Sequence, residues 1–194
     1  IFNEWIPIVN DHSSEYGFDA ISFKNENINT IIISYGGTDA THEVEIGDFL
    51  TDAMVFLGQD KEITNRKCMQ LNLAESFYEV TQKVCPNYNY YVCGHSLGGW
   101  LAQNIILKYK LSGITFNSLN FKTPQPKYDK IKNFIIYQDV IGRLGYAIDN
   151  KYIFIMDNVN IDDIKLECHY CRQYFPIMLI DKPQECYLLK HDGN

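Results

Sequence analysis

The stretch Gly94-His95-Ser96-Leu97-Gly98-Gly99 decides the fold of this chain, because it fits the pattern G-x-S-x-G. Residues 88–93 before it form an apolar, aromatic run typical of a strand, and residues 100–107 after it have an apolar helix pattern. A serine between a strand and a helix needs a strained backbone corner, for which Gly94 and Gly98 leave room. The pattern predicts a nucleophilic Ser96 hydroxyl, with free N–H groups of the following helix aimed at the reacting centre. A glycine-rich turn with a solvent-facing serine is the plainer alternative.

Strand and helix patterns alternate around this corner. Such alternation favours a mostly parallel sheet with helices on both faces, and no linker or repeat divides the chain. We therefore expect a single α/β domain over residues 1–194. Strands are expected at residues 18–23, 30–35, 88–93, 113–116, 133–137 and 152–156, and helices at residues 43–57, 62–84 and 100–107.

Composition narrows the class of protein. The chain has 194 residues, of which 46% are hydrophobic, which is typical of a globular domain with a substantial core. Its formal net charge of −7 argues against a nucleic-acid partner. No apolar run approaches the length of a membrane-spanning helix, and both a cytoplasmic location and a secreted effector fit the sequence. The first residue is Ile1 rather than Met, so we expect the natural start to be missing.

The six cysteines do not indicate a metal centre. Cys168-His169-Tyr170-Cys171 has the spacing of half a zinc site, but the sequence offers no second C-x-x-C and no paired histidines to complete it. Buried reduced thiols are the simpler interpretation. We expect neither a metal nor a cofactor.

A serine nucleophile needs an acid that orients its base, and Asp139 is the best candidate for that acid. It follows the expected strand at residues 133–137, and functional side chains gather at the carboxyl ends of strands in open α/β sheets. A turn or helix-cap aspartate is the alternative role.

The base must be a histidine that follows the acid in the chain, which leaves His169 and His191. His169 is favoured because apolar neighbours anchor its segment, whereas His191 lies in a polar tail that would fray. His95 is expected to pack away from the nucleophile. The oxyanion hole is expected to use the N–H of Leu97 and a backbone donor from the loop Gly36-Gly37-Thr38, to which Thr38 could add its hydroxyl.

Several segments together resemble the class-three lipases, and more closely their small bacterial and viral relatives, the Mbeg1-like serine esterases. The resemblance covers about residues 30–145. It implies an α/β-hydrolase fold, Ser96 as nucleophile, Asp139 as acid, and Thr38 with Leu97 as oxyanion donors. One departure is Gly36, because the family often has Arg before its Gly-Thr step. The matching segments are Tyr35-Gly36-Gly37-Thr38-Asp39, Asp48-Phe49-Leu50-Thr51-Asp52, Gly94–Gly99, Thr115-Phe116-Asn117-Ser118 and Asp139-Val140-Ile141-Gly142-Arg143-Leu144-Gly145.

The sequence therefore predicts a hydrolase of carboxylic esters, most plausibly of lipids, such as a lipase or phospholipase. Its partners would be the ester substrate and, transiently, a membrane or micelle surface. A thioesterase or acyltransferase with the same triad, and a non-catalytic module on a decayed hydrolase fold, are the alternatives. Residues 40–57 either form a lid over the site or pack permanently on the sheet.

Overall fold

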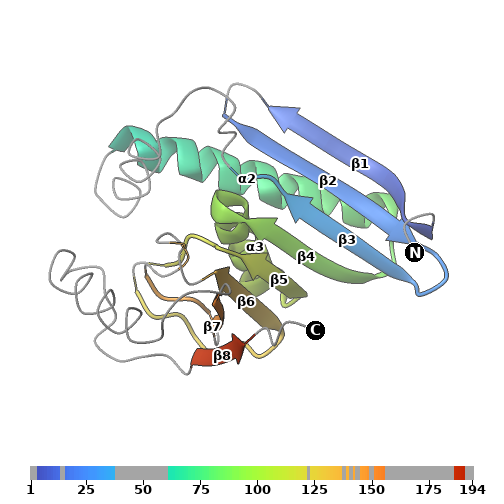
Figure 1. The fold of residues 1–194 in the computed structure, drawn as a ribbon. Coiled ribbons are helices and arrows are strands. Elements are labelled where there is room, and N and C mark those ends of the chain that lie inside the picture. The colour runs from blue at the N-terminus through green and yellow to red at the C-terminus, as the bar shows by residue number, and fades with distance from the viewer. Residues whose placement is uncertain are drawn as a thin grey trace, which may run out of the picture.

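The structure is a computed structural model that describes residues 4–13, 16–37, 61–121, 123–136, 139, 142, 145–148, 151–155 and 186–190. The described strands form one eight-stranded sheet, in which they lie side by side in sequence order (Figure 1). The strands are β1 (Ile6–Ser13), β2 (Phe18–Asn25), β3 (Thr30–Tyr35), β4 (Asn89–His95), β5 (Ser112–Phe116), β6 (Ile131–Ile136), β7 (Lys151–Ile155) and β8 (Cys186–Lys190). The helices are α2 (Lys61–Val84) and α3 (Ser96–Tyr109).

Strand β2 runs opposite to all the other strands of the sheet. β1, β2 and β3 pair antiparallel, since short turns join them, whereas β3 to β8 are all parallel. The carboxyl ends of β3 to β8 consequently meet at one edge, which we call the carboxyl edge. The mostly parallel sheet predicted from the sequence is confirmed.

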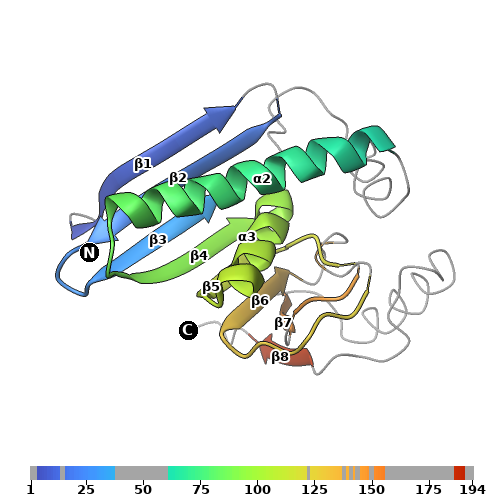
Figure 2. The same cartoon turned by 180° about the vertical axis from the view of Figure 1, so that it is seen from behind.

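Both described helices lie on the same face of the sheet, where they contact each other and the strands (Figure 2). Their apolar side chains close the core over Ile31, Ile33 and Val92, which are at most 1% exposed. Tyr35 fastens β3 to α2, because its hydroxyl donates a hydrogen bond of 2.8 Å to the Ala74 carbonyl. Burial raises the pKa of Tyr35 well above its ordinary value, so the phenol stays protonated and able to donate. Helices on the opposite face stay a prediction.

The predicted strands at residues 18–23, 30–35, 88–93, 113–116, 133–137 and 152–156 are confirmed within two residues at each end, and so is the helix at residues 62–84. The outer strands β1 and β8 were not expected. The predicted helix at residues 43–57, and with it the lid, lies outside the described residues. Among the described residues, no helix is long and apolar enough to cross a membrane.

Candidate active site

Ser96 lies at a sharp corner between β4 and α3. His95 is still extended, with φ −115° and ψ 144°, and Ser96 then has φ 53°, in the left-handed region that side chains other than glycine rarely adopt. Such a conformation costs roughly 1–3 kcal/mol and persists only where the surroundings enforce it. This is the strained strand-to-helix corner that the G-x-S-x-G pattern predicts.

Gly94 and Gly98 are what allow the corner to close. A Cβ on Gly94 would lie 2.2 Å from the Gly98 carbonyl oxygen, and a Cβ on Gly98 would lie 2.2 Å from the Tyr35 carbonyl oxygen. Both distances are far below contact distance, and both opposing atoms belong to the backbone. The first turn of α3 therefore packs directly on the backbone of β3 and β4, with no room for a side chain at either glycine.

The hydroxyl of Ser96 is buried, since the residue is 5% exposed, and its Oγ has no hydrogen-bond partner among the described residues. A buried hydroxyl without a hydrogen bond lowers the stability of the fold by about 1–3 kcal/mol, so such a group is often kept for a functional role. Cys93 is the other nucleophilic group nearby, but burial raises the pKa of its thiol, although a hydrogen bond with Ser34 acts in the opposite direction. The thiol is therefore protonated at neutral pH, so Cys93 supplies no thiolate to compete with Ser96.

Asp139 follows β6, at the same carboxyl edge as Ser96. Its N–H donates to the Ile136 carbonyl, and its Oδ1 accepts a 2.7 Å hydrogen bond from the N–H of Gly142. β5 alone separates the strands that precede Ser96 and Asp139, which places their backbones roughly 10 Å apart. Asp139 is half-buried at the carboxyl edge. The hydrogen bond from Gly142 fixes one oxygen of its carboxylate.

A buried polar network joins the Ser96 corner to the Asp139 turn. The Leu119 N–H donates to the Ser96 carbonyl at 3.1 Å, and the Asn120 amide donates to the Gly142 carbonyl at 3.0 Å. Gln103, two turns into α3, donates to the Ser118 hydroxyl and accepts from the Ile148 N–H. Sequence reasoning missed this network; its one local signal is Gln103, a polar residue within the apolar pattern of α3.

The oxyanion side of the site is partly described. The N–H of Leu97 belongs to the first turn of α3, whose N–H groups have no partner within the helix. A Cβ on Gly37 would lie 3.5 Å from the Ser96 Cβ, so the loop after β3 begins directly beside Ser96. Gly36 has no room for a side chain, because a Cβ there would lie 2.8 Å from the Asp19 Cβ. Thr38 lies outside the described residues.

The candidate bases His169 and His191 also lie outside the described residues. His191 directly follows β8, which pairs in parallel with β7 as far as Lys190. The tail is therefore strand up to the residue before His191, which answers the fraying expected there; the anchoring expected of His169 lies outside the described residues. His95 is exposed rather than packed, because it faces away from α2 and α3. Within the described ranges, no group of three or more His, Cys, Asp or Glu could hold a metal ion.

Solved structures similar to this chain are lipases. The Lip2 lipase from Yarrowia lipolytica matches with a TM-score of 0.54 and 14% identity, covering 78% of this chain and 66% of the lipase. The lipase from Rhizopus microsporus var. chinensis has a TM-score of 0.51 and 16% identity, covering 73% and 56%. The Rhizomucor miehei triacylglyceride lipase also has a TM-score of 0.51, at 14% identity, covering 77% and 66%. By sequence, the chain matches no family model and no curated protein.

These similarities establish the fold. The chain has an α/β-hydrolase fold of the kind found in fungal triacylglycerol lipases. It spans 56–66% of the length of the three lipases. The fold and the strained Ser96 corner were both expected from the sequence.

Proposed function

We propose that this chain is a serine hydrolase of carboxylic esters, and that lipids are its substrate class. The observation that carries the proposal is Ser96: a buried hydroxyl without a described partner, on a left-handed corner at the carboxyl edge. The backbone strain and the unpaired hydroxyl both act against stability, and a nucleophile that must meet a base and a substrate explains both. The lipase fold supports the lipid class.

In the proposed reaction, the Ser96 oxygen attacks the ester carbonyl while a histidine takes its proton. The N–H groups of Leu97 and Thr38 bind the oxyanion, each contributing about 3–4 kcal/mol to the transition state. Asp139 orients the histidine and stabilises its cation. The histidine then protonates the leaving alcohol, and water releases the acid from the acyl-enzyme by the same route. No cofactor takes part.

The first test is covalent labelling together with ester hydrolysis. We expect the purified chain to hydrolyse p-nitrophenyl esters and to react with a fluorophosphonate at Ser96, located by peptide mass mapping. Label elsewhere, or no label on a folded chain, would support the non-catalytic alternative. Faster turnover of matched thioesters than of oxygen esters would support a thioesterase instead.

The base is identified by comparing His169→Ala with His191→Ala. We expect one variant to lose about 10³-fold or more in kcat for the same ester, because the serine then has no proton acceptor, while the other keeps near wild-type activity. Since β8 anchors the chain up to Lys190, we propose His191 as the base and His169 as the competitor. Loss in His169→Ala alone would reverse this assignment. Full activity in both variants would contradict the triad.

A further inference from the structure

The four residues Asn117–Asn120, which we call the linking segment, lie between the two halves of the proposed active site. β5 ends just before them, and it is flanked by β4, which leads into Ser96, and by β6, which precedes Asp139. Within the segment, the Leu119 N–H donates to the Ser96 carbonyl at 3.1 Å. The linking segment is thereby attached to the backbone of the residue proposed as the nucleophile.

Asn117, the first residue of the linking segment, holds the chain just before Asp139. Its N–H donates to the Phe134 carbonyl at 2.8 Å, which extends the β5–β6 ladder by one bond. Its side-chain Oδ1 accepts a 2.8 Å hydrogen bond from the Ile136 N–H. In a continuing parallel ladder, a backbone carbonyl of β5 would accept from that N–H. Because the side chain replaces this carbonyl, the backbone can turn away toward the Ser96 corner while β6 stays attached.

The backbone turn at Asn117 is strained. Its φ of 42° lies in the left-handed region, which residues other than glycine rarely adopt. Glycine would relieve the strain but would offer no side-chain acceptor to the Ile136 N–H. Asparagine meets both demands of the position, since it tolerates this region better than most side chains and carries a carbonyl oxygen.

Asn120, the last residue of the linking segment, holds the chain just after Asp139. Its side chain is buried, with the residue 2% exposed, and its amide donates to the Gly142 carbonyl at 3.0 Å. The Gly142 N–H in turn donates to Asp139 Oδ1 at 2.7 Å. Gly142 also packs on the first residue of the segment, since a Cβ on it would lie 3.1 Å from the Asn117 Cα. Gly142 therefore joins the linking segment to the Asp139 carboxylate.

We propose that Asn117 and Asn120 are positioning residues for ester hydrolysis: they hold the Asp139 turn from both sides and set its distance from Ser96. They act through Asp139, which orients the histidine, and neither side chain touches the ester. The proposal rests on the ester-hydrolase function proposed above. A displacement of about 1 Å at a catalytic group can cost about 10²-fold in rate, so the spacing has a large effect on turnover.

The first test replaces Asn117 by glycine and by aspartate. Asn117→Gly removes an exposed hydrogen bond, which water can replace, and also removes the backbone strain, so the melting temperature should stay within about 3 °C of wild type. We expect kcat for a p-nitrophenyl ester to fall about tenfold or more, with KM within about twofold, because the Asp139 turn is free to shift. Asn117→Asp keeps an oxygen acceptor for the Ile136 N–H and should have a kcat within about threefold of wild type.

Asn87→Gly is the matched control for this pair of variants. Asn87 also has a left-handed φ, of 68°, but it lies between α2 and β4, at the amino ends of the parallel strands. Its replacement by glycine should leave kcat unchanged. A wild-type kcat in Asn117→Gly, or a kcat in Asn117→Asp as low as in Asn117→Gly, would overturn the role of Asn117.

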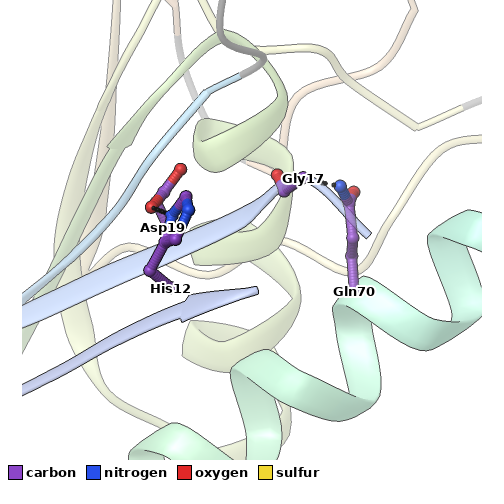
Figure 3. A network of polar contacts seen from close by, with 4 residues as sticks. All are labelled: His12, Gly17, Asp19 and Gln70. Atoms are coloured by element: carbon purple, nitrogen blue, oxygen red, sulfur yellow. Dashed lines mark hydrogen bonds and ion pairs between the residues drawn. The ribbon is translucent and has the colours of Figure 1, made fainter. Parts of the chain in front are cut away.

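Asn120→Leu tests the buried end of the linking segment, with Gln70→Leu as its matched control. The Gln70 amide is also buried and donates to a backbone carbonyl, that of Gly17, at 3.2 Å. This bond lies in the turn before the His12–Asp19 pair, two strands from β4 on the side away from β6 (Figure 3). Both variants should lower the melting temperature by several degrees, but only Asn120→Leu should lower kcat about tenfold or more. Equal kcat values for the two, measured below both melting temperatures, would overturn the role of Asn120.

Amide hydrogen exchange separates this proposal from the proposed function, because it needs no substrate. Exchange of the Gly142 N–H, which is bonded to Asp139, is followed by NMR in the wild type and in Asn117→Gly. We expect about tenfold faster exchange in the variant. The Asn27 N–H, which donates to the Asn25 side chain at 3.0 Å in the β2–β3 turn, should exchange at an unchanged rate.

The two proposals then fail in different ways. If the chain hydrolyses no ester but exchange at Gly142 becomes faster in Asn117→Gly, the linking segment does hold the Asp139 turn and the hydrolase proposal fails. If the chain hydrolyses esters but neither the exchange rate nor kcat changes in that variant, the positioning proposal fails alone.

Discussion

Ser96→Ala is expected to lower kcat for ester hydrolysis by a factor on the order of 10⁴–10⁶, because no other group at the corner can form the acyl-enzyme. The fold should be unaffected. The hydroxyl has no described hydrogen-bond partner to lose, and alanine at φ 53° meets about the same backbone strain as serine. We therefore expect the free energy of unfolding to change by less than about 1 kcal/mol, measured by urea titration.

Ser112→Ala is the matched control for this prediction. Ser112 is the first residue of β5, so it lies at the amino ends of the parallel strands, away from Ser96 at their carboxyl ends. It is also partly shielded from solvent. This variant should keep the wild-type kcat. A Ser96→Ala protein that retains more than a tenth of the wild-type kcat would contradict the nucleophile assignment. If the Ser96→Ala protein is inactive but also fails to unfold cooperatively, the variant has lost its fold. Fluorophosphonate labelling of the wild type then decides the assignment.

The sequence predicted the nucleophile corner because everything that makes it is local. All its signals lie within about one strand and one helix of Ser96: two glycines four residues apart, an apolar run before them and a helix pattern after them. Steric contact between neighbouring turns then leaves few other conformations for that stretch. Asp139 was predicted by the same kind of reasoning, because it follows the end of a strand whose β-branched and aromatic residues mark it clearly, and its role as the acid stays a prediction.

The outer strands were missed because their signals are not local. β1 is an edge strand, so its exposed positions carry Pro7, Asn10 and His12 and break the alternation that identifies a strand. β8 is defined by its pairing with β7, a partner more than thirty residues earlier in the chain. The His12–Asp19 pair and the Asn120–Gly142 hydrogen bond were out of reach for the same reason, since each joins residues that only the folded sheet brings together.

Gly98→Ala is expected to destabilise the chain by about 3 kcal/mol or more, a large part of the 5–15 kcal/mol by which domains are usually stable. The new Cβ would lie 2.2 Å from the Tyr35 carbonyl oxygen and 2.5 Å from that of Gly36. Neither backbone atom can yield unless α3 moves away from β3, which would also displace Ser96. For a chain of this size, the melting temperature should fall by roughly 6–12 °C, measured by circular dichroism.

Gly17→Ala separates the steric clash from the general effect of replacing glycine. Outside the adjacent residues, the nearest heavy atom to the Cβ position of Gly17 is the Gln70 amide nitrogen, at 3.8 Å, so only the left-handed φ of 62° opposes alanine. That conformation costs roughly 1–2 kcal/mol, so the melting temperature should fall by only a few degrees. If Gly98→Ala melts at the same temperature as Gly17→Ala or higher, then α3 does not pack against the β3 backbone. In that case no close contact there holds Ser96 in its strained conformation.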